Sequence, residues 1–117
     1  MLMKLKDGKS KVLTLSYDDG VVQDIRLMGI LDKHGIRGTF NINTGMYLPE
    51  DAQRERYYGR LKRSEALALY KDSAHEVAVH SLTHPFLETL KKPQVLMEIL
   101  EDRKNIEAQY EIGRAHV

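Results

Sequence analysis

Cysteine is absent from the 117-residue chain, which excludes disulfides, thiolate metal sites and cysteine nucleophiles. Any metal site must therefore use histidine and carboxylate side chains. The sequence also lacks a run of about 18 apolar residues, so no transmembrane helix is expected. Residues 1–11 interleave lysine with leucine and methionine and lack the continuous apolar stretch of a signal peptide. The cytoplasm is therefore the default expected location.

Neither sign of charge is in excess, because 18 Lys and Arg residues stand against 17 Asp and Glu residues for a net charge of +1. A nucleic-acid-binding module that works through bulk charge needs a basic surplus, so nucleic acid is not an expected partner. Hydrophobic residues make up 42% of the chain and charged residues 30%, which is ordinary for a globular protein. The length suits one domain or part of one.

Short β-rich runs alternate with helical patterns along the chain. Strands are predicted over residues 11–17, 37–43 and 76–79, and helices over residues 21–34, 64–70 and 93–110. A strand, a helix and a strand within about thirty residues form a βαβ unit, so the strands should be parallel. The fold class is therefore α/β, either an open sheet or a barrel. Three strands are too few to complete either, and a (β/α) barrel needs about 200 residues, so the chain is expected to be incomplete.

Two segments outside the strands carry further predictions. Residues 44–61 are expected to form a long loop, and its basic side chains, Arg60 among them, are interpreted as a solvated surface. The helix predicted from Pro93 onward carries one apolar stripe that is expected to pack on the core, made of Leu96, Ile99, Leu100, Ile106 and Tyr110.

Two groups of candidate functional residues follow predicted strands, at the strand ends where α/β proteins gather such residues. Asp18-Asp19-Gly20 follows the first strand, and His80 and His84 follow the third. Taken alone, an Asp-Asp-Gly sequence is more often a simple turn, and two histidines four residues apart are more often incidental. Their predicted convergence on one edge of the sheet favours a functional site.

Together these residues supply two imidazoles and two carboxylates. Two histidines and one carboxylate, with an open position for water, form a catalytic zinc arrangement, although non-haem iron uses similar ligands. The remaining carboxylate would be a suitable general base, so the pattern indicates metal-assisted hydrolysis. The pair differs from the helical His-Glu-x-x-His sequence of metalloproteases, because Ser81 replaces the glutamate and Pro85 disfavours a helix at His84. A loop at the strand end is expected instead.

Three segments resemble motifs of the polysaccharide deacetylases, also called NodB-type domains or family 4 carbohydrate esterases. Leu13–Gly20 resembles the first motif, usually Thr-Phe-Asp-Asp-Gly, and Gly38–Ile42 resembles the second strand of the family, commonly Ala-Thr-Phe-Phe. His75–Pro85 is similar to the second motif, usually Gly-His-Glu-x-x-x-His-[Ser/Thr]-x-x-His-Pro. The resemblance runs from about Lys11 to Tyr110 with the right order and spacing.

The resemblance implies a role for each matched residue. Asp18 would be the catalytic base, and Asp19, His80 and His84 would bind a divalent metal, zinc first, with cobalt or another ion as an alternative. Ser81 would support the second motif by hydrogen bonding. The implied fold is a distorted (β/α) barrel with parallel strands. The implied substrate is an acetylated carbohydrate, from which acetyl groups are removed at N- or O-acetylated sugars of a polysaccharide.

Later motifs of the family supply an arginine, substrate-groove residues and a general-acid histidine, and nothing after His84 matches them. Residues 1–111 are therefore interpreted as the N-terminal portion of a deacetylase domain in truncated form, with the activity assigned to a longer parent protein. Residues 112–117 are also what a common DNA-sequencing adapter encodes in one reading frame, so they are hypothesised to be a non-native tail. Two alternative functions stay open: a related amidohydrolase acting on a small non-sugar amide, and a non-catalytic carbohydrate-binding relative.

Overall fold

A computed structural model describes residues 5–54 and 58–112 of the chain. Strands and helices alternate along it in the order β1 (Ser16–Asp18), α1 (Gln23–Lys33), β2 (Thr39–Ile42), α2 (Arg63–Tyr70), β3 (Glu76–Val79) and α3 (Lys92–Tyr110). Two single turns of 3-10 helix, η1 (Lys6–Gly8) and η2 (Leu87–Thr89), complete the described elements. The alternation confirms the predicted α/β class.

The sheet is parallel and has the strand order β1-β2-β3. Its register aligns Tyr17 with Phe40 and Phe40 with Val77, so the carboxyl ends of all three strands lie at one edge. The predicted parallel βαβ pairing is therefore confirmed. Because β1 and β3 each pair with one strand in this part of the chain, the described sheet is open rather than closed into a barrel.

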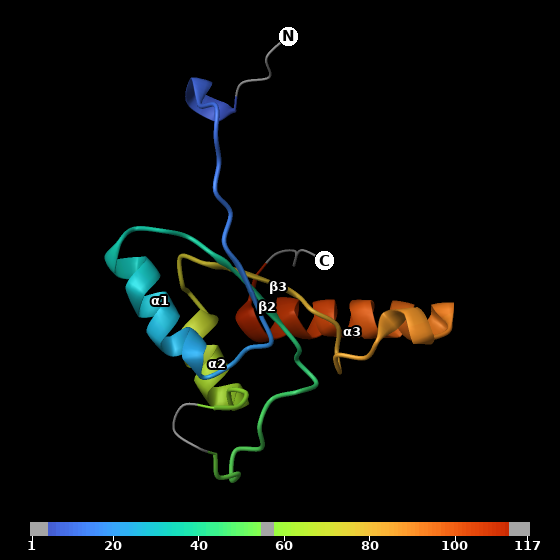
Figure 1. Cartoon of the computed structure of the whole chain (residues 1–117). Coiled ribbons are helices and arrows are strands. Elements are labelled where there is room, and N and C mark those ends of the chain that lie inside the picture. Colours follow the sequence, from blue (N-terminus) through green and yellow to red (C-terminus); the bar gives the residue numbers. More distant parts are fainter. Residues whose placement is uncertain (1–4, 55–57, 113–117) are drawn as a thin grey trace.

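The helices cover one face of this sheet. Alternate residues of β2 and β3, namely Phe40, Ile42, Val77 and Val79, are buried among helix side chains such as Ile106. In Figure 1, α1 and α2 lie to one side of the strands and α3 crosses behind them toward the other side. Burying side chains of this size contributes about 1.5–3 kcal/mol each, so these positions anchor the sheet to the helices.

The first strand is shorter than predicted. Residues 11–15 are extended but lie outside β1, and Val12 and Leu13 are 72% and 81% exposed. The reason is the register: β2 begins at Thr39, which pairs with Ser16 and donates its N–H to the carbonyl of Leu15, so residues 11–14 have no strand beside them. They form an arm that runs away from the sheet to η1 (Figure 1).

The buried face of α3 differs from the predicted apolar stripe. Leu96 and Leu100 are 57% and 39% exposed, and this part of the prediction is wrong. The buried residues recur every four positions and are Glu98, Asp102, Ile106 and Tyr110. The N-terminal half of α3 buries carboxylates because it faces loops with backbone N–H groups rather than apolar side chains.

Two further predictions concern membrane-spanning helices and the C-terminal tail. Within residues 5–54 and 58–112, no helix is long and apolar enough to cross a membrane. The hypothesised tail of residues 112–117 lies outside the described residues from residue 113 onward.

Candidate metal centre

Asp19, His80 and His84 converge at the carboxyl edge of the sheet. Asp19 directly follows β1, and His80 directly follows β3. Oδ1 of Asp19 lies 3.5 Å from Nε2 of His80 and 3.3 Å from Nε2 of His84. One ligand atom from each of the three residues lies within 4.8 Å of the others. The predicted convergence of these side chains is thus observed, while their role as metal ligands stays a prediction.

The two distances from the Asp19 oxygen to the imidazole nitrogens fit a small divalent ion. Tetrahedral zinc ligands at about 2.0–2.1 Å from the ion stand about 3.3–3.4 Å from one another, which is close to both oxygen–nitrogen distances. The side chains of Asp19, His80 and His84 are 40%, 30% and 49% exposed, so an ion could enter from solvent. The set of two imidazoles and one carboxylate suits zinc and leaves a coordination position for a further group.

The loop that carries both histidines has an unusual backbone. Ser81 and His84 have φ values of 68° and 56°, and Asp19 has a φ of 81°, all in the left-handed region. The chain enters these turns from the sheet, because the N–H groups of Asp19 and His80 donate to the carbonyls of Asn41 and Ile42 at 2.9 and 3.2 Å. The site is therefore built directly onto the strand ends, and the helical alternative for the histidine pair is excluded as predicted.

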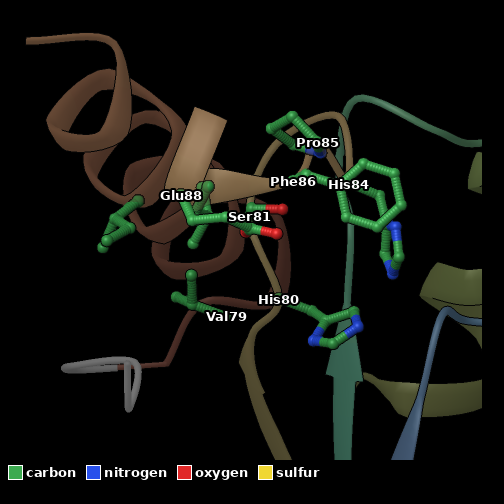
Figure 2. Close-up of a pocket in the computed structure, with 9 residues that line it drawn as sticks. Val79, His80, Ser81, His84, Pro85, Phe86 and Glu88 are labelled. Atoms are coloured by element: carbon green, nitrogen blue, oxygen red, sulfur yellow. The ribbon is translucent and has the colours of Figure 1, made fainter. Parts of the chain in front are cut away.

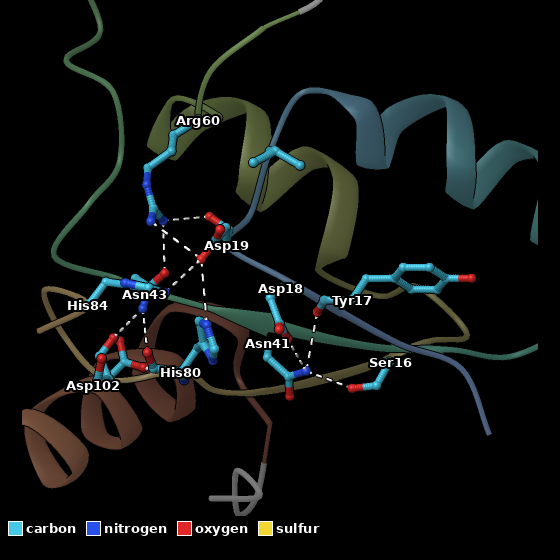
Figure 3. A network of polar contacts seen from close by, with 12 residues as sticks. Ser16, Tyr17, Asp18, Asp19, Asn41, Asn43, Arg60, His80, His84 and Asp102 are labelled. Carbon is cyan, nitrogen blue, oxygen red and sulfur yellow. Dashed lines mark hydrogen bonds and ion pairs between the residues drawn. The ribbon is translucent and has the colours of Figure 1, made fainter. Parts of the chain in front are cut away.

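Asp18, the predicted base, lies outside the three-residue cluster. It ends β1 on the sheet face that the helices leave uncovered, in line with Asn41 of β2. Nδ2 of Asn41 donates to Oδ1 of Asp18 at 2.8 Å and to Oγ of Ser16 at 2.7 Å. These bonds orient an exposed carboxylate beside the candidate centre (Figure 3).

Arg60 and Asn43 join the parts of the site, a role that was not predicted for Arg60. Nη1 of Arg60 donates to the carbonyl of Asp19 at 2.6 Å and to Oδ1 of Asn43 at 2.8 Å, and Nη2 lies 3.5 Å from Oδ1 of Asp19. Asn43 is 2% exposed and donates to the carbonyls of His80 and Ser81. Figure 3 shows the guanidinium above the Asp19 carboxylate and the imidazole of His80 below it. The interpretation of Arg60 as solvated surface is wrong.

Two buried carboxylates of α3 hold the loops behind the centre. Asp102 accepts from the N–H of His80 at 3.1 Å and from the N–H and hydroxyl of Thr44, each at 2.7 Å. Glu98 accepts from the N–H and hydroxyl of Thr83 at 2.8 and 2.7 Å. Burial raises the pKa of Asp102, and the bonds from Thr44 and His80 act against that shift.

A shallow pocket of about 440 Å³ opens beside the two histidines. Its wall is lined by Val79, His80, Ser81, His84, Pro85, Phe86, Leu87, Glu88 and Ile99. Figure 2 shows both imidazoles at one side of this pocket, with the ring of Phe86 beside His84. Phe86 is 77% exposed, so the pocket presents an apolar surface next to the candidate ligands.

His75 has a structural role at the opposite end of the sheet. Its Nδ1 accepts from the N–H of Gly38 at 3.1 Å, so Nε2 carries the proton and donates to Asp32 at 2.8 Å. The imidazole side chain is fully buried and packs edge-on against Phe40 with ring centroids 5.4 Å apart.

The model of the polysaccharide deacetylase family matches residues 5–117 of the chain. Among solved structures, a deacetylase from Streptococcus pyogenes, PplD, in complex with acetate shares 19% identity at a TM-score of 0.75. The peptidoglycan deacetylase PdaC from Bacillus subtilis shares 26% identity at a TM-score of 0.62. A family 4 carbohydrate esterase from Streptomyces lividans in complex with acetate shares 26% identity at a TM-score of 0.61.

These alignments cover 97%, 90% and 83% of this chain but only 46%, 46% and 44% of the three structures, in the order given. The chain thus spans about half the length of the solved structures it matches. The three parallel strands correspond to part of their barrel, which confirms the predicted partial barrel. None of the curated proteins compared with the chain matches it.

Proposed function

Because the chain belongs to the polysaccharide deacetylase family, we propose that it is part of a longer protein that removes acetyl groups from N- or O-acetylated sugars of a polysaccharide. Asp19, His80 and His84 would hold the divalent metal, with zinc as the first candidate. The observation that carries this proposal is the convergence of one carboxylate and two imidazoles at the strand ends, within 4.8 Å of one another. The relatives named above support an acetylated carbohydrate as substrate and acetate as product.

Each part of the site has a task in this reaction. A bound divalent ion would polarise the acetyl carbonyl and lower the pKa of water. Asp18 acts as general base and takes a proton at its carboxylate, which Asn41 orients through Oδ1. Arg60 holds the Asp19 carboxylate in place, because it donates to the backbone carbonyl of Asp19 and pairs with Oδ1 of the same residue. The exposed ring of Phe86 offers an apolar surface for the acetyl methyl group or a sugar face.

Metal binding and catalysis are tested separately. Zinc titration of this chain by calorimetry should detect one site that is lost in His80→Ala. Acetate release by the longer parent protein from acetylated chitooligosaccharides or peptidoglycan fragments should disappear in Asp18→Asn while zinc stays bound. Release from small non-sugar amides alone would support the related amidohydrolase instead, and binding of sugars without any release would support a carbohydrate-binding relative.

The extent of the functional protein is part of the proposal. Residues 1–111 would be the N-terminal portion of a longer deacetylase domain, and the activity would belong to that parent protein. Resequencing the locus from source DNA tests this, and native codons for residues 112–117 followed by a genuine stop codon would contradict it. A cytoplasmic location is likewise proposed, and fractionation of the producing cells tests it.

A further inference from the structure

We propose that Glu98 and Asp102 of α3 are positioning residues that set the backbone of the loop of residues 80–84 and thereby the separation of its two imidazoles. Neither side chain reaches the candidate centre itself, since both contact backbone and hydroxyl groups behind it. The inference rests on the proposed metal site, because its consequence is a change in metal affinity.

Asp102 fixes the first end of the loop. Asp102 is 0% exposed, and each of its two carboxylate oxygens accepts hydrogen bonds from a different segment of the chain. Oδ2 accepts from the N–H of His80 at 3.1 Å, while Oδ1 accepts from the N–H and hydroxyl of Thr44. Asn105, one turn away, donates to the Thr44 hydroxyl at 2.9 Å. Asp102 therefore joins the chain beyond β2 to the first histidine beyond β3.

Glu98 fixes the second end of the loop, one helical turn earlier on the same face of α3. Its carboxylate, in a residue 5% exposed, accepts both the N–H and the hydroxyl of Thr83, which directly precedes His84. The backbone carbonyl of Glu98 also accepts from the N–H of Leu82 at 3.0 Å. Residues four apart on a helix face the same way, so one rigid element sets both ends of the loop.

The loop needs such a template because its own conformation is unfavourable. Ser81 and His84 both have left-handed backbones, which cost L-amino acids about 1–2 kcal/mol each. A free loop would relax from these angles, and each relaxation would turn an imidazole away from Asp19. Three hydrogen bonds hold the loop against that change: Asp102 accepts from the N–H of His80, and Glu98 accepts from the N–H and hydroxyl of Thr83.

Zinc affinity of the full chain, measured by calorimetry, tests the inference. Asp102→Asn places an NH₂ group against either the His80 N–H or the Thr44 donors, and Glu98→Ala removes both Thr83 contacts. Each variant should weaken zinc binding about 10- to 100-fold, the range seen when groups that orient metal ligands are removed. Glu98→Gln should restore most of the affinity, because the Thr83 hydroxyl can accept as well as donate.

Two controls on α3 separate positioning from general loss of stability. Glu101→Ala removes a carboxylate that pairs with Lys104 in solvent, away from the loop, and should leave the affinity unchanged. Ile106→Val removes a buried methyl group from the core and should lower the Tm without changing the affinity. Hydrogen exchange in the metal-free chain should accelerate at the amides of His80 and Thr83 in Asp102→Asn and Glu98→Ala, respectively, and stay unchanged in Glu101→Ala.

The outcomes are distinct. Unchanged affinity in Asp102→Asn and Glu98→Ala, or an equal loss in Ile106→Val, would overturn the positioning role while leaving the metal site intact. An unmodified chain that binds no zinc would overturn the proposed site instead. In that case hydrogen exchange decides the positioning role alone, and unchanged rates at His80 and Thr83 would overturn it.

Discussion

The Tyr70→Phe substitution should lower the free energy of unfolding by about 2 kcal/mol. The hydroxyl of Tyr70 donates to Oδ2 of Asp24 at 2.5 Å, and the two residues are 2% and 4% exposed. A hydrogen bond to a charged group contributes about 1.5–3 kcal/mol, and phenylalanine fills the same space without leaving a large cavity. The remaining bond to Asp24, from the N–H of Val21, is longer at 3.3 Å.

The loss should depend on pH in a defined direction. Burial raises the pKa of Asp24 above its ordinary 3.8, and the bonds from Tyr70 and Val21 oppose this shift. The folded state therefore holds the Asp24 proton more tightly than the unfolded chain, so this group lowers stability as pH rises from 3.8 through its folded pKa. Removing the Tyr70 hydroxyl raises the pKa further, so the destabilisation is greatest where Asp24 is ionised and smaller where it is protonated.

Thermal denaturation followed by circular dichroism, at neutral pH and at the lowest pH where the chain stays folded, measures this. For a chain of this length, a loss of about 2 kcal/mol corresponds to a Tm lower by about 8 °C. Tyr110→Phe is the matched control, since its hydroxyl meets the neutral hydroxyl of Tyr47 at 2.7 Å and should contribute about 1 kcal/mol. An equal or smaller loss in Tyr70→Phe, or a loss that grows as pH falls, would refute the reasoning.

Three further predictions concern packing, pH and metal. Gly45→Ala should destabilise by about 1–3 kcal/mol and weaken zinc binding, because a Cβ there would meet the Leu82 carbonyl oxygen at 2.6 Å; denaturation and zinc titration test this. Hydrogen bonds from Arg54 lower the pKa of Glu65 in the folded state. The stabilisation of the fold by the Glu65 carboxylate is therefore fully present above pH 4.5 and is lost as pH falls through the folded pKa. Glu65→Gln should make the free energy of unfolding, measured by denaturation at several pH values, depend less on pH in this range. Zinc at about one hundred times its Kd should add about 2.7 kcal/mol, reversed by a chelator, and no shift would argue against specific binding.

The sequence predicts the convergence of Asp19, His80 and His84 because parallel strands bring their carboxyl ends to one edge. That rule needs only the positions of the strands. It says nothing of Arg60, which reaches Asp19 across 41 residues of chain through a loop without a repeating pattern. A basic residue in such a loop has no sequence signal that separates a solvated side chain from one directed inward.

The carboxylates of α3 did carry a signal. Glu98 and Asp102 continue the four-residue repeat of Ile106 and Tyr110, so all four lie on one stripe of the helix. A search for apolar residues selects Leu96 and Leu100 instead, because it assumes that a helix buries only hydrophobic groups. Here the stripe passes from an apolar core to loops rich in backbone donors, and the type of buried residue changes with it.

Asp19, Ser81 and His84 have left-handed backbones, which strain the chain at positions that include two candidate metal ligands. Glycine adopts this conformation readily, so a glycine substitution relieves the local backbone strain. At Asp19 and His84 the same change deletes a candidate ligand, so a relaxed backbone and a ligating side chain exclude each other at these positions. A relative that does not bind metal would be free to carry glycine there, without the strain of a left-handed L-residue. Glycine at the position of Asp19 or His84 would therefore indicate a relative whose site does not bind metal.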